Sequence, residues 1–438
     1  MADSRRSKAS RGSLLSVLDI GSSKTTCLIV RMLPDAQNQF LYGRTHESEV
    51  IGIGHTRSTG MKSGTIVDLD AIEKSVRYAV EAAEKMAGVT VDSLVVNLTA
   101  GRLSSTNSSA KIGLDPDKPV SRADLDHVLR AALAHSARRD RHILHLLPVS
   151  YTLDGQKGID DPIGMVGEEL HLNMHCLTAD HAPMRNMEAV LNRAHLAVET
   201  MVAAPYASGL STLVDDELEL GCACVDMGAG TTTVGVFHER KFVHCDAIAI
   251  GGHHITLDLA RAFSCSIEDA ERLKTRSGSV LLASSDDNDL ISISPLGDGT
   301  EQQQIYQVPR SIVNRIIRAR VEETLELLRD RLNSSGFSSI VGKRVILTGG
   351  AAQMSGLSDL ARQILGRNVR IGRPLGVRGL PIEAKGTAFA AAVGLLVYPQ
   401  CSEADYGNAG IYGSASAHAA TGTHGAMGRV AAWLRESF

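Results

Sequence analysis

Residues 225–236 read Val-Asp-Met-Gly-Ala-Gly-Thr-Thr-Thr-Val-Gly-Val, a stretch in which two apolar runs flank a glycine-rich turn. This pattern predicts two β-strands joined by a turn whose backbone requires glycine. Successive N–H groups in such a turn can point at an anion, and the threonine hydroxyls add donors. Asp226 ends the first strand, where a carboxylate can hold Mg²⁺ through water. Taken alone, the stretch is explained equally well as an ordinary glycine-rich hairpin.

The same order of residues occurs much earlier in the chain, at 16–31, which read Ser-Val-Leu-Asp-Ile-Gly-Ser-Ser-Lys-Thr-Thr-Cys-Leu-Ile-Val-Arg. Two hairpins with matching order indicate an internal duplication. A third stretch, 345–352, reads Val-Ile-Leu-Thr-Gly-Gly-Ala-Ala and predicts a strand that ends in a Gly-Gly turn ahead of a helix at 356–365. Such a turn lets the backbone approach a flat ligand closely.

Together the three stretches resemble the actin, Hsp70 and sugar-kinase superfamily. The resemblance implies an α/β fold of two actin-like domains, a duplicated ribonuclease-H-like fold, whose two hairpins hold the phosphates of ATP from opposite domains. The Gly-Gly turn would then hold the adenosine. Within the superfamily, the chain from about residue 13 to its C-terminus resembles the bacterial cell-division family FtsA. The second hairpin reads Gly-Ala-Gly-Thr, where Gly-Gly-Gly-Thr or Gly-Thr-Gly-Thr is commoner, and Ala229 fits if its φ is negative.

The resemblance also implies a set of site residues. Asp19 and Asp226 would orient Mg²⁺ and its waters, and they are the candidates for orienting an attacking water. The nucleotide-binding candidates are Gly21, Ser22, Ser23, Lys24, Gly228, Gly230, Thr231, Thr232, Gly251, Gly252, Glu271, Lys274, Gly349, Gly350 and Ala351. Glu271 and Lys274 share a helix face. They either flank the ribose and base or form a surface ion pair, which is usually worth less than about 1 kcal/mol.

Composition restricts the class of protein. The chain has 438 residues, of which 43% are hydrophobic and 21% charged, so it is long enough for two domains with their own cores. Its net charge of −4 argues against a dedicated nucleic-acid binder. Seven scattered cysteines without a Cys-x-x-Cys motif indicate a reducing, cytosolic setting, and the sixteen histidines show no metal-binding spacing.

The domain organisation follows from the resemblance and from local signals. The phrase at 158–165, Gly-Ile-Asp-Asp-Pro-Ile-Gly-Met, is typical of the small subdomain inserted in FtsA. Small residues at 207–213 and 386–394 predict two closely crossing helices at a domain hinge. A helix is expected at 70–87 with Asp70 as its N-cap, and a polar, mobile loop at 284–304. The expected units are a disordered arm at 1–12; domain 1 at 13–93, 178–213 and 386–398; the inserted α+β subdomain at 94–177; domain 2 at 214–385, with a small subdomain at about 257–333; a flexible linker at 399–424; and an amphipathic helix at 425–438.

Two further surfaces are predicted to bind partners. The helix that begins at Pro309 carries arginines at 310, 315, 318 and 320, which form either a solvated basic face or a contact for the C-terminal tail of the tubulin-like protein FtsZ. The resemblance favours the tail, with Arg320 as the first candidate. At 100° per residue the final segment has one apolar side with a tryptophan at its boundary, which predicts a helix that lies on an anionic membrane surface. Its membrane candidates are Met427, Val430, Trp433, Leu434 and Phe438. The alternative is a helix that docks back on the core.

The function that the resemblance implies is that of an actin-like, ATP-binding cell-division protein with weak ATPase activity at most. It would polymerise, anchor the FtsZ ring at the septum to the cytoplasmic face of the inner membrane, and help to recruit other division proteins. A single amphipathic segment with few large apolar residues binds a membrane weakly, whereas many such segments on one polymer bind it firmly. Two alternatives remain: a soluble actin-like adaptor of the pilus-assembly type, and a small-molecule kinase of the same superfamily.

Overall fold

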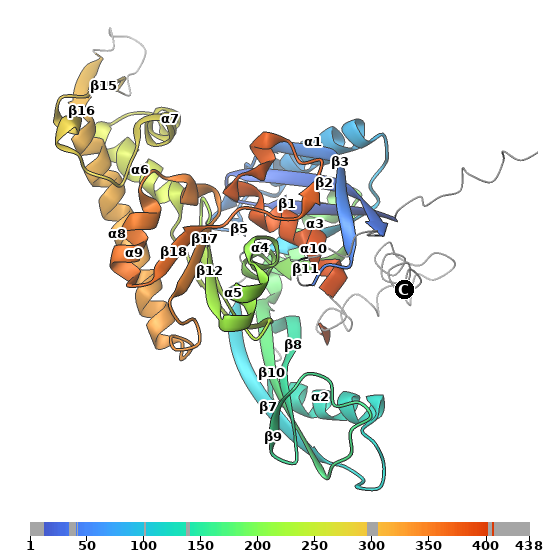
Figure 1. Cartoon of the computed structure of the whole chain (residues 1–438). Coiled ribbons are helices and arrows are strands. Elements are labelled where there is room, and N and C mark those ends of the chain that lie inside the picture. The colour runs from blue at the N-terminus through green and yellow to red at the C-terminus, as the bar shows by residue number, and fades with distance from the viewer. Residues whose placement is uncertain are drawn as a thin grey trace, which may run out of the picture.

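The computed structural model describes residues 13–34, 41, 43–99, 102–136, 141–295, 305–401 and 405–406. Two large mixed sheets form the centre of the molecule, and a third, smaller sheet projects from one end (Figure 1). The first large sheet has the strand order β11-β6-β1-β2-β3-β19. Its strands are β1 (Ser13–Ile20), β2 (Lys24–Pro34), β3 (His46–Arg57), β6 (Ser93–Leu98), β11 (Ala197–Ala203) and β19 (Val377–Arg378).

The second large sheet repeats the plan of the first. Its strand order is β14-β13-β12-β17-β18, with β12 (Cys222–Met227), β13 (Thr232–His238), β14 (Lys241–Ile248), β17 (Arg344–Thr348) and β18 (Asn368–Ile371). In both sheets three antiparallel strands in chain order are extended by parallel strands on the other side of the first strand. The duplication predicted from the two hairpins is therefore present as two sheets of matching topology, which confirms the actin-like α/β fold.

Helix α1 (Leu69–Ala87) covers the first sheet because its apolar positions recur at helical spacing. Ile72, Val76, Ala79 and Ala83 are buried along one face. The predicted N-cap was wrong by two positions. The Asp68 carboxylate, and not that of Asp70, accepts the N–H groups of Asp70 and Ala71, at 3.0 Å each. Asp70 lies inside the first turn, where a negative charge also favours the helix dipole.

Two helices of small residues connect the domains, as expected. Helix α4 (Ala204–Thr212) and helix α10 (Ala390–Cys401) cross so closely that a β-carbon on Gly394 would lie 1.7 Å from the Ala207 carbonyl oxygen. The second helix begins later than residue 386, after a 3-10 turn at Thr387–Phe389, and it runs past residue 399. The expected linker start at 399 therefore differs from the structure: helix α10 continues to Cys401, and Asp405 is buried.

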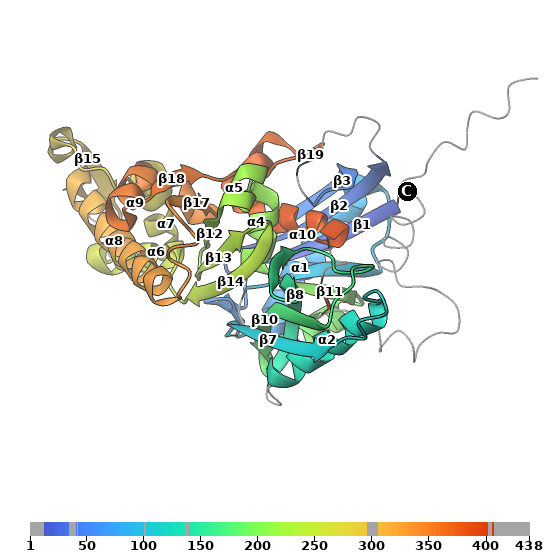
Figure 2. The ribbon, with the colours of Figure 1, turned by 60° about the horizontal axis from the view of Figure 1, so that its bottom comes forward.

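The smaller sheet and one helix form the inserted subdomain, which Figure 2 shows from another side. The sheet has the order β7-β10-β8-β9 and packs against α2 (Arg122–Ser136) over a core of its own. Its strands are β7 (Ser104–Gly113), β8 (Arg141–Leu153), β9 (Gln156–Ile159) and β10 (Glu169–Asp180). The polar run at 104–109 is part of the edge strand β7, whose only partner in the sheet is β10.

The remaining elements complete the two domains. They are β4 (Met61–Lys62), β5 (Thr65–Ile66), α3 (His181–Arg193), α5 (Asp215–Leu220), α6 (Gly252–Phe263), α7 (Ile267–Ser277), β15 (Leu290–Ile293), β16 (Tyr306–Pro309), α8 (Arg310–Ser334) and α9 (Leu357–Leu365). The region at 284–304 was predicted as a loop, but Ser284–Asp287 form a 3-10 turn and β15 pairs with β16. Among the described residues no helix is both long and apolar enough to cross a membrane.

Candidate nucleotide site

The two predicted hairpins have the same local geometry. In the first, the Gly21 N–H donates to the Lys24 carbonyl at 2.9 Å, and in the second the Gly228 N–H donates to the Thr231 carbonyl at 2.9 Å. Asp19 pairs across its hairpin with Thr26, and Asp226 pairs in the equivalent register with Thr233. The two carboxylates therefore occupy equivalent positions at the ends of β1 and β12.

The tips of the hairpins meet. A β-carbon on Gly230 would lie 2.5 Å from Ser22 Oγ and 2.9 Å from Ser63 Cα. Ser22 Oγ in turn accepts the Gly64 N–H at 2.9 Å, so its own hydroxyl hydrogen stays available to an acceptor. The structure thus brings residues of both sheets to one place, an arrangement that the family resemblance implies.

Both aspartates resist ionisation in this setting. Asp19 is 8% exposed, and burial, together with the charge of Asp226, raises its pKa from 3.8 to about 7, although Lys24 opposes this. Burial also raises the pKa of Asp226, whereas a 2.5 Å hydrogen bond from Ser208 Oγ lowers it. Two carboxylates with raised pKa values, one buried and one partly buried, fit a cation, since a divalent ion offsets the cost of ionising both.

Lys24 lies beside the two carboxylates. Its ammonium donates to the Ala388 carbonyl at 2.9 Å and lies 3.2 Å from the centre of the Phe389 ring. Burial lowers its pKa to about 8, against the attraction of Asp19 and Asp226. A largely buried cation is thus held at the first hairpin by the segment that leads into α10.

The Gly-Gly turn after β17 packs against the second hairpin. Gly349 has φ +88°, and a β-carbon there would lie 2.3 Å from Asp226 Oδ1 and 2.6 Å from the Met227 carbonyl oxygen. Thr387 Oγ1 donates to the Gly349 carbonyl at 2.7 Å and holds the turn from the other side. Only glycine fits a position with this backbone conformation and this lack of space.

Glu271 and Lys274 form more than a surface pair. Lys274 Nζ lies 2.6 Å from Glu271 Oε2, and it also donates to Thr256 Oγ1 at 2.9 Å and to the Gly252 carbonyl at 3.1 Å. Thr256 Oγ1 donates to Glu271 at 2.5 Å. Burial acts to raise the pKa of Glu271, yet the hydrogen bonds from Lys274 and Thr256 hold it below its usual value. The pair therefore ties α7 to the start of α6.

Gly251 and Gly252, predicted as nucleotide-binding, have their N–H groups already engaged. The Gly252 N–H donates to the Gly228 carbonyl at 2.9 Å, and the Gly251 N–H donates to His254 Nδ1 at 3.1 Å. The next N–H, of His253, donates to the Ala229 carbonyl at 2.8 Å. In the structure these residues hold the second hairpin in place.

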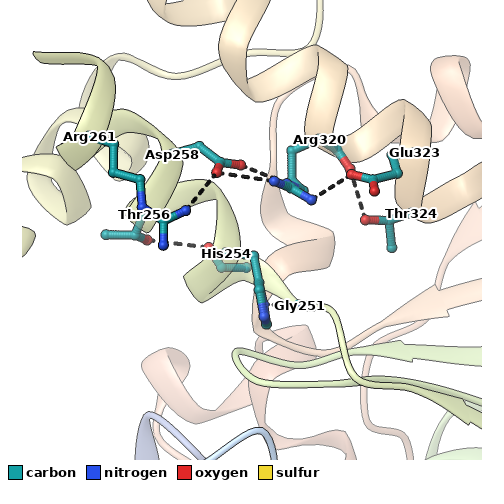
Figure 3. A network of polar contacts seen from close by, with 9 residues as sticks. Gly251, His254, Thr256, Asp258, Arg261, Arg320, Glu323 and Thr324 are labelled. Atoms are coloured by element: carbon teal, nitrogen blue, oxygen red, sulfur yellow. Dashed lines mark hydrogen bonds and ion pairs between the residues drawn. The ribbon is translucent and has the colours of Figure 1, made fainter.

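Arg320 is held by carboxylates of its own chain (Figure 3). Its Nε lies 2.6 Å and its Nη2 3.1 Å from the two oxygens of Asp258 on α6, and its Nη1 lies 2.5 Å from Glu323. The neighbouring basic residues are also paired: Arg318 with Glu322 at 2.7 Å, and Arg310 with Asp289 at 2.7 Å. An acidic partner at Arg320 would have to compete with Asp258.

Replacing Asp19 with asparagine is expected to flatten the pH dependence of stability. Because the folded pKa of about 7 lies above the ordinary value of 3.8, the folded chain binds more protons in that interval. Stability contributed by Asp19 is therefore present below about pH 4 and is lost as pH rises towards 7, at up to about 1.4 kcal/mol per pH unit. Urea unfolding without nucleotide at pH 5 and pH 8 measures the difference. Asp117→Asn, which alters an exposed carboxylate, is the control and should show the same difference between pH 5 and pH 8 as the unaltered chain. The same difference in Asp19→Asn as in the unaltered chain would contradict the prediction.

The five membrane candidates in the final segment lie outside the described residues, and so do the N-terminal arm at 1–12 and residues 407–424 of the expected linker. Sequence reasoning missed three contributors to the site: Ser208, Thr256 and Phe389. Ser208 and Phe389 lie in the two segments of small residues predicted to cross, and Thr256 lies in α6, but no sequence pattern assigns any of the three to the site. Only the fold shows their proximity to Asp226, Glu271 and Lys24 respectively.

The fold is similar to that of solved actin-like structures. A chain of a "PilM-PilN type IV pilus biogenesis complex" matches with a TM-score of 0.62 and 15% identity, over 88% of this chain and 98% of that one. MreB5 of Spiroplasma citri bound to ADP matches with a TM-score of 0.53 and 11% identity, over 88% and 96% of the two chains. The protein thus has a fold of the actin-like class.

Sequence comparison then gives the family. A family model described as "Cell division protein FtsA" matches residues 223–394, and one described as "SHS2 domain inserted in FTSA" matches 100–178. Cell division protein FtsA of Rhizobium meliloti is 55% identical over 428 residues, covering 98% of this chain and 96% of the relative. That of Escherichia coli K12 is 30% identical over 437 residues, covering 98% and 100%. The chain belongs to the FtsA family of cell-division proteins.

Proposed function

We propose that the chain binds ATP with Mg²⁺ where the two hairpins meet. The observation that supports this best is the pair of equivalent carboxylates beside Lys24, of which Asp19 is buried and Asp226 is partly buried. Because the N–H groups of Gly21 and Gly228 already donate within their hairpins, those at 22–23 and 229–232 would hold the phosphates. Glu271, Lys274 and the turn at 349–351 would hold the adenosine. The metal would neutralise phosphate charge, and the two carboxylates would orient its waters.

Hydrolysis, where it occurs, would be slow, and the nucleotide would act mainly as a ligand that stabilises a polymer. Titration of ATP with and without Mg²⁺ tests the binding proposal. We expect Asp226→Asn to remove the Mg²⁺ dependence while the chain stays folded. Unchanged affinity in the variant, at equal Mg²⁺, would reject the metal-orienting role of Asp226.

As a member of a division-protein family, the chain acts with division-ring partners, and we propose which ones. It would polymerise through its actin-like body, bind the FtsZ C-terminal tail and recruit other division proteins. It would sit on the cytoplasmic face of the inner membrane at the division site, attached through the amphipathic segment at 425–438. One segment of this kind would bind the membrane weakly. Polymerisation would link many of them, and linked segments bind firmly because they act at high effective concentration.

Anionic liposomes test the membrane proposal, because Trp433 is the only tryptophan in the chain. Emission of Trp433 and co-sedimentation are followed with and without ATP. A blue shift together with sedimentation that ATP enhances is the expected result. Emission that is already blue in buffer and does not change with lipid would mean that the segment packs on the protein, and the soluble adaptor would become the leading interpretation.

Reversing the charge of Arg320 tests the tail proposal. We expect Arg320→Glu to weaken binding of an FtsZ tail peptide at least tenfold, because an acidic peptide would meet a carboxylate. Arg329→Glu on the same helix is the matched control, since Arg329 is bound only by its neighbour Asp330 among the ion pairs described for it. Asp258→Asn, which removes one of the two carboxylates that hold Arg320, should strengthen binding. Equal affinities for Arg320→Glu and Arg329→Glu would remove Arg320 from the contact.

The pilus-type adaptor is the second candidate, because a PilM–PilN complex shares the fold. At 15% identity that likeness concerns the fold alone, whereas the division-protein relatives are 30–55% identical over nearly the whole chain. Competition between a pilus-protein peptide and an FtsZ tail peptide for the purified chain distinguishes the two candidates. The kinase alternative predicts phosphate transfer to a panel of sugars.

A further inference from the structure

A buried carboxylate lies at the end of the described part of the chain. Asp405 is 6% exposed, and it accepts three hydrogen bonds. Two come from β8 of the inserted subdomain: the Leu146 N–H at 2.9 Å and His145 Nδ1 at 2.5 Å. The third comes from the Tyr398 hydroxyl of α10, at 2.8 Å. One side chain thus joins the inserted subdomain to a hinge helix.

His145 extends this contact to the other hinge helix. Its ring is fully buried, and Nε2 lies 2.9 Å from the backbone N–H of Ala203, the residue before α4. Because that N–H can only donate, Nε2 must accept, and Nδ1 therefore carries the proton that is donated to Asp405. The ring also meets Tyr206 of α4 and Tyr398 of α10 edge-on, at centroid distances of 5.3 and 5.7 Å.

A second contact of the inserted subdomain uses different residues. Ser105 Oγ on β7 lies 2.8 Å from His175 Nε2 and accepts the N–H of Cys245 on β14 at 3.2 Å. His175 Nδ1 lies 2.9 Å from the Phe242 carbonyl, also on β14, and burial lowers the pKa of His175 to about 3. This contact reaches β14 of the second domain, and the nearby charge of Asp405 acts to raise the pKa of His175 against the effect of burial.

We propose that Asp405 is a positioning residue that fixes the inserted subdomain to both hinge helices, so that the C-terminal end of α10 and the inserted subdomain move as one unit. A carboxylate suits this role because it accepts from all three donors, whereas an amide would present its NH₂ group to at least one of them. A buried acceptor that loses its partners is costly, so the arrangement has one favoured geometry. The proposal depends on neither nucleotide nor membrane.

A distance measurement tests this. Spin labels attached through non-natural amino acids at Lys85 on α1 and His127 on α2, both exposed, report the placement of the inserted subdomain relative to domain 1. We expect one narrow distance distribution for the full chain and at least a twofold broader one for Asp405→Asn. Tyr398→Phe, which removes one donor and keeps the ring, should broaden it less. A chain that ends after Tyr406 keeps Asp405 and should match the full chain.

Three results would overturn the proposal. One is an unchanged width in both Asp405→Asn and Tyr398→Phe. Another is a lowered melting temperature without broadening, since a role in general stability alone predicts that outcome. The last is broadening in the chain that ends after Tyr406 equal to that in Asp405→Asn, because the residues that follow would then do the positioning. If Asp405→Asn fails to fold, Tyr398→Phe alone decides between broadening and none.

Discussion

Replacing Gly394 with alanine is expected to destabilise the chain by about 3 kcal/mol or more, although alanine is the better helix former by about 1 kcal/mol. The added β-carbon would lie 1.7 Å from the Ala207 carbonyl oxygen and 2.3 Å from its carbonyl carbon, where α10 crosses α4. Backbone atoms of a buried helix cannot rotate away, so the two helices must separate. Since these helices connect the two domains, we also expect weaker nucleotide binding.

Gly113→Ala is the matched control for Gly394→Ala. It adds the same atom at a glycine on β7 with no atom within 4 Å of the new β-carbon. Urea unfolding of both variants, with circular dichroism as the signal, gives the comparison. Helix propensity alone predicts that Gly394→Ala is the more stable variant, and that result would mean that the crossing adapts at low cost.

Replacing Gly349 with alanine is expected to lower both stability, by about 2–4 kcal/mol, and ATP affinity, by about 100-fold. The position has φ +88°, which strains any residue with a β-carbon. The new atom would also lie 2.3 Å from Asp226 Oδ1, so the carboxylate proposed to orient Mg²⁺ would have to move. Calorimetric titration of ATP and urea unfolding of the nucleotide-free variant measure the two effects.

The adjacent Gly350→Ala variant separates these effects. Its β-carbon would have only Ala388 Cβ nearby, at 3.9 Å, which is ordinary contact, and its φ lies outside the left-handed region. We therefore expect stability within about 0.5 kcal/mol of the unaltered chain. ATP affinity should still fall, because the proposed adenosine position requires close approach to the turn. An ATP affinity in Gly350→Ala equal to that of the unaltered chain would mean that the adenosine does not bind at this turn.

Much of the fold could be predicted because its signals are local. The two hairpins indicate the duplication because both contain Asp, Gly, hydroxyl residues and β-branched residues in the same order. Small residues predict the close crossing of α4 and α10. The errors arise where a partner distant in sequence decides the outcome. The segment at 284–304 was predicted as a loop, yet its residues 290–293 form β15, which pairs with β16 at 306–309. Helix α10 extends beyond residue 399 because Tyr398 and Asp405 pack against β8.

In the candidate site, too, local patterns could be predicted, whereas contacts between distant residues could not. Asp19, Lys24, Asp226 and Gly349 could be found because each stands next to a strand end or a turn with a recognisable pattern. The sequence could not show that the N–H groups of Gly251 and Gly252 are used within the protein. Their engagement depends on where the His254 ring and the Gly228 carbonyl point. The pairing of Arg320 with Asp258 likewise joins two helices that are separate in sequence.

The Arg57–Glu268 ion pair joins β3 of the first domain to α7 of the second at 3.0 Å, with both side chains more than 60% exposed. An exposed pair of this kind contributes less than about 1 kcal/mol, and salt screens it. It can therefore guide the two domains together without locking them. Under the proposed function, a nucleotide bound between the hairpins would supply most of the interaction between the two domains. Without it, the two domains would be held together weakly and could separate easily. The presence or absence of nucleotide would then change how the two domains are placed relative to each other. That change would alter the surface that a neighbouring subunit in a polymer contacts.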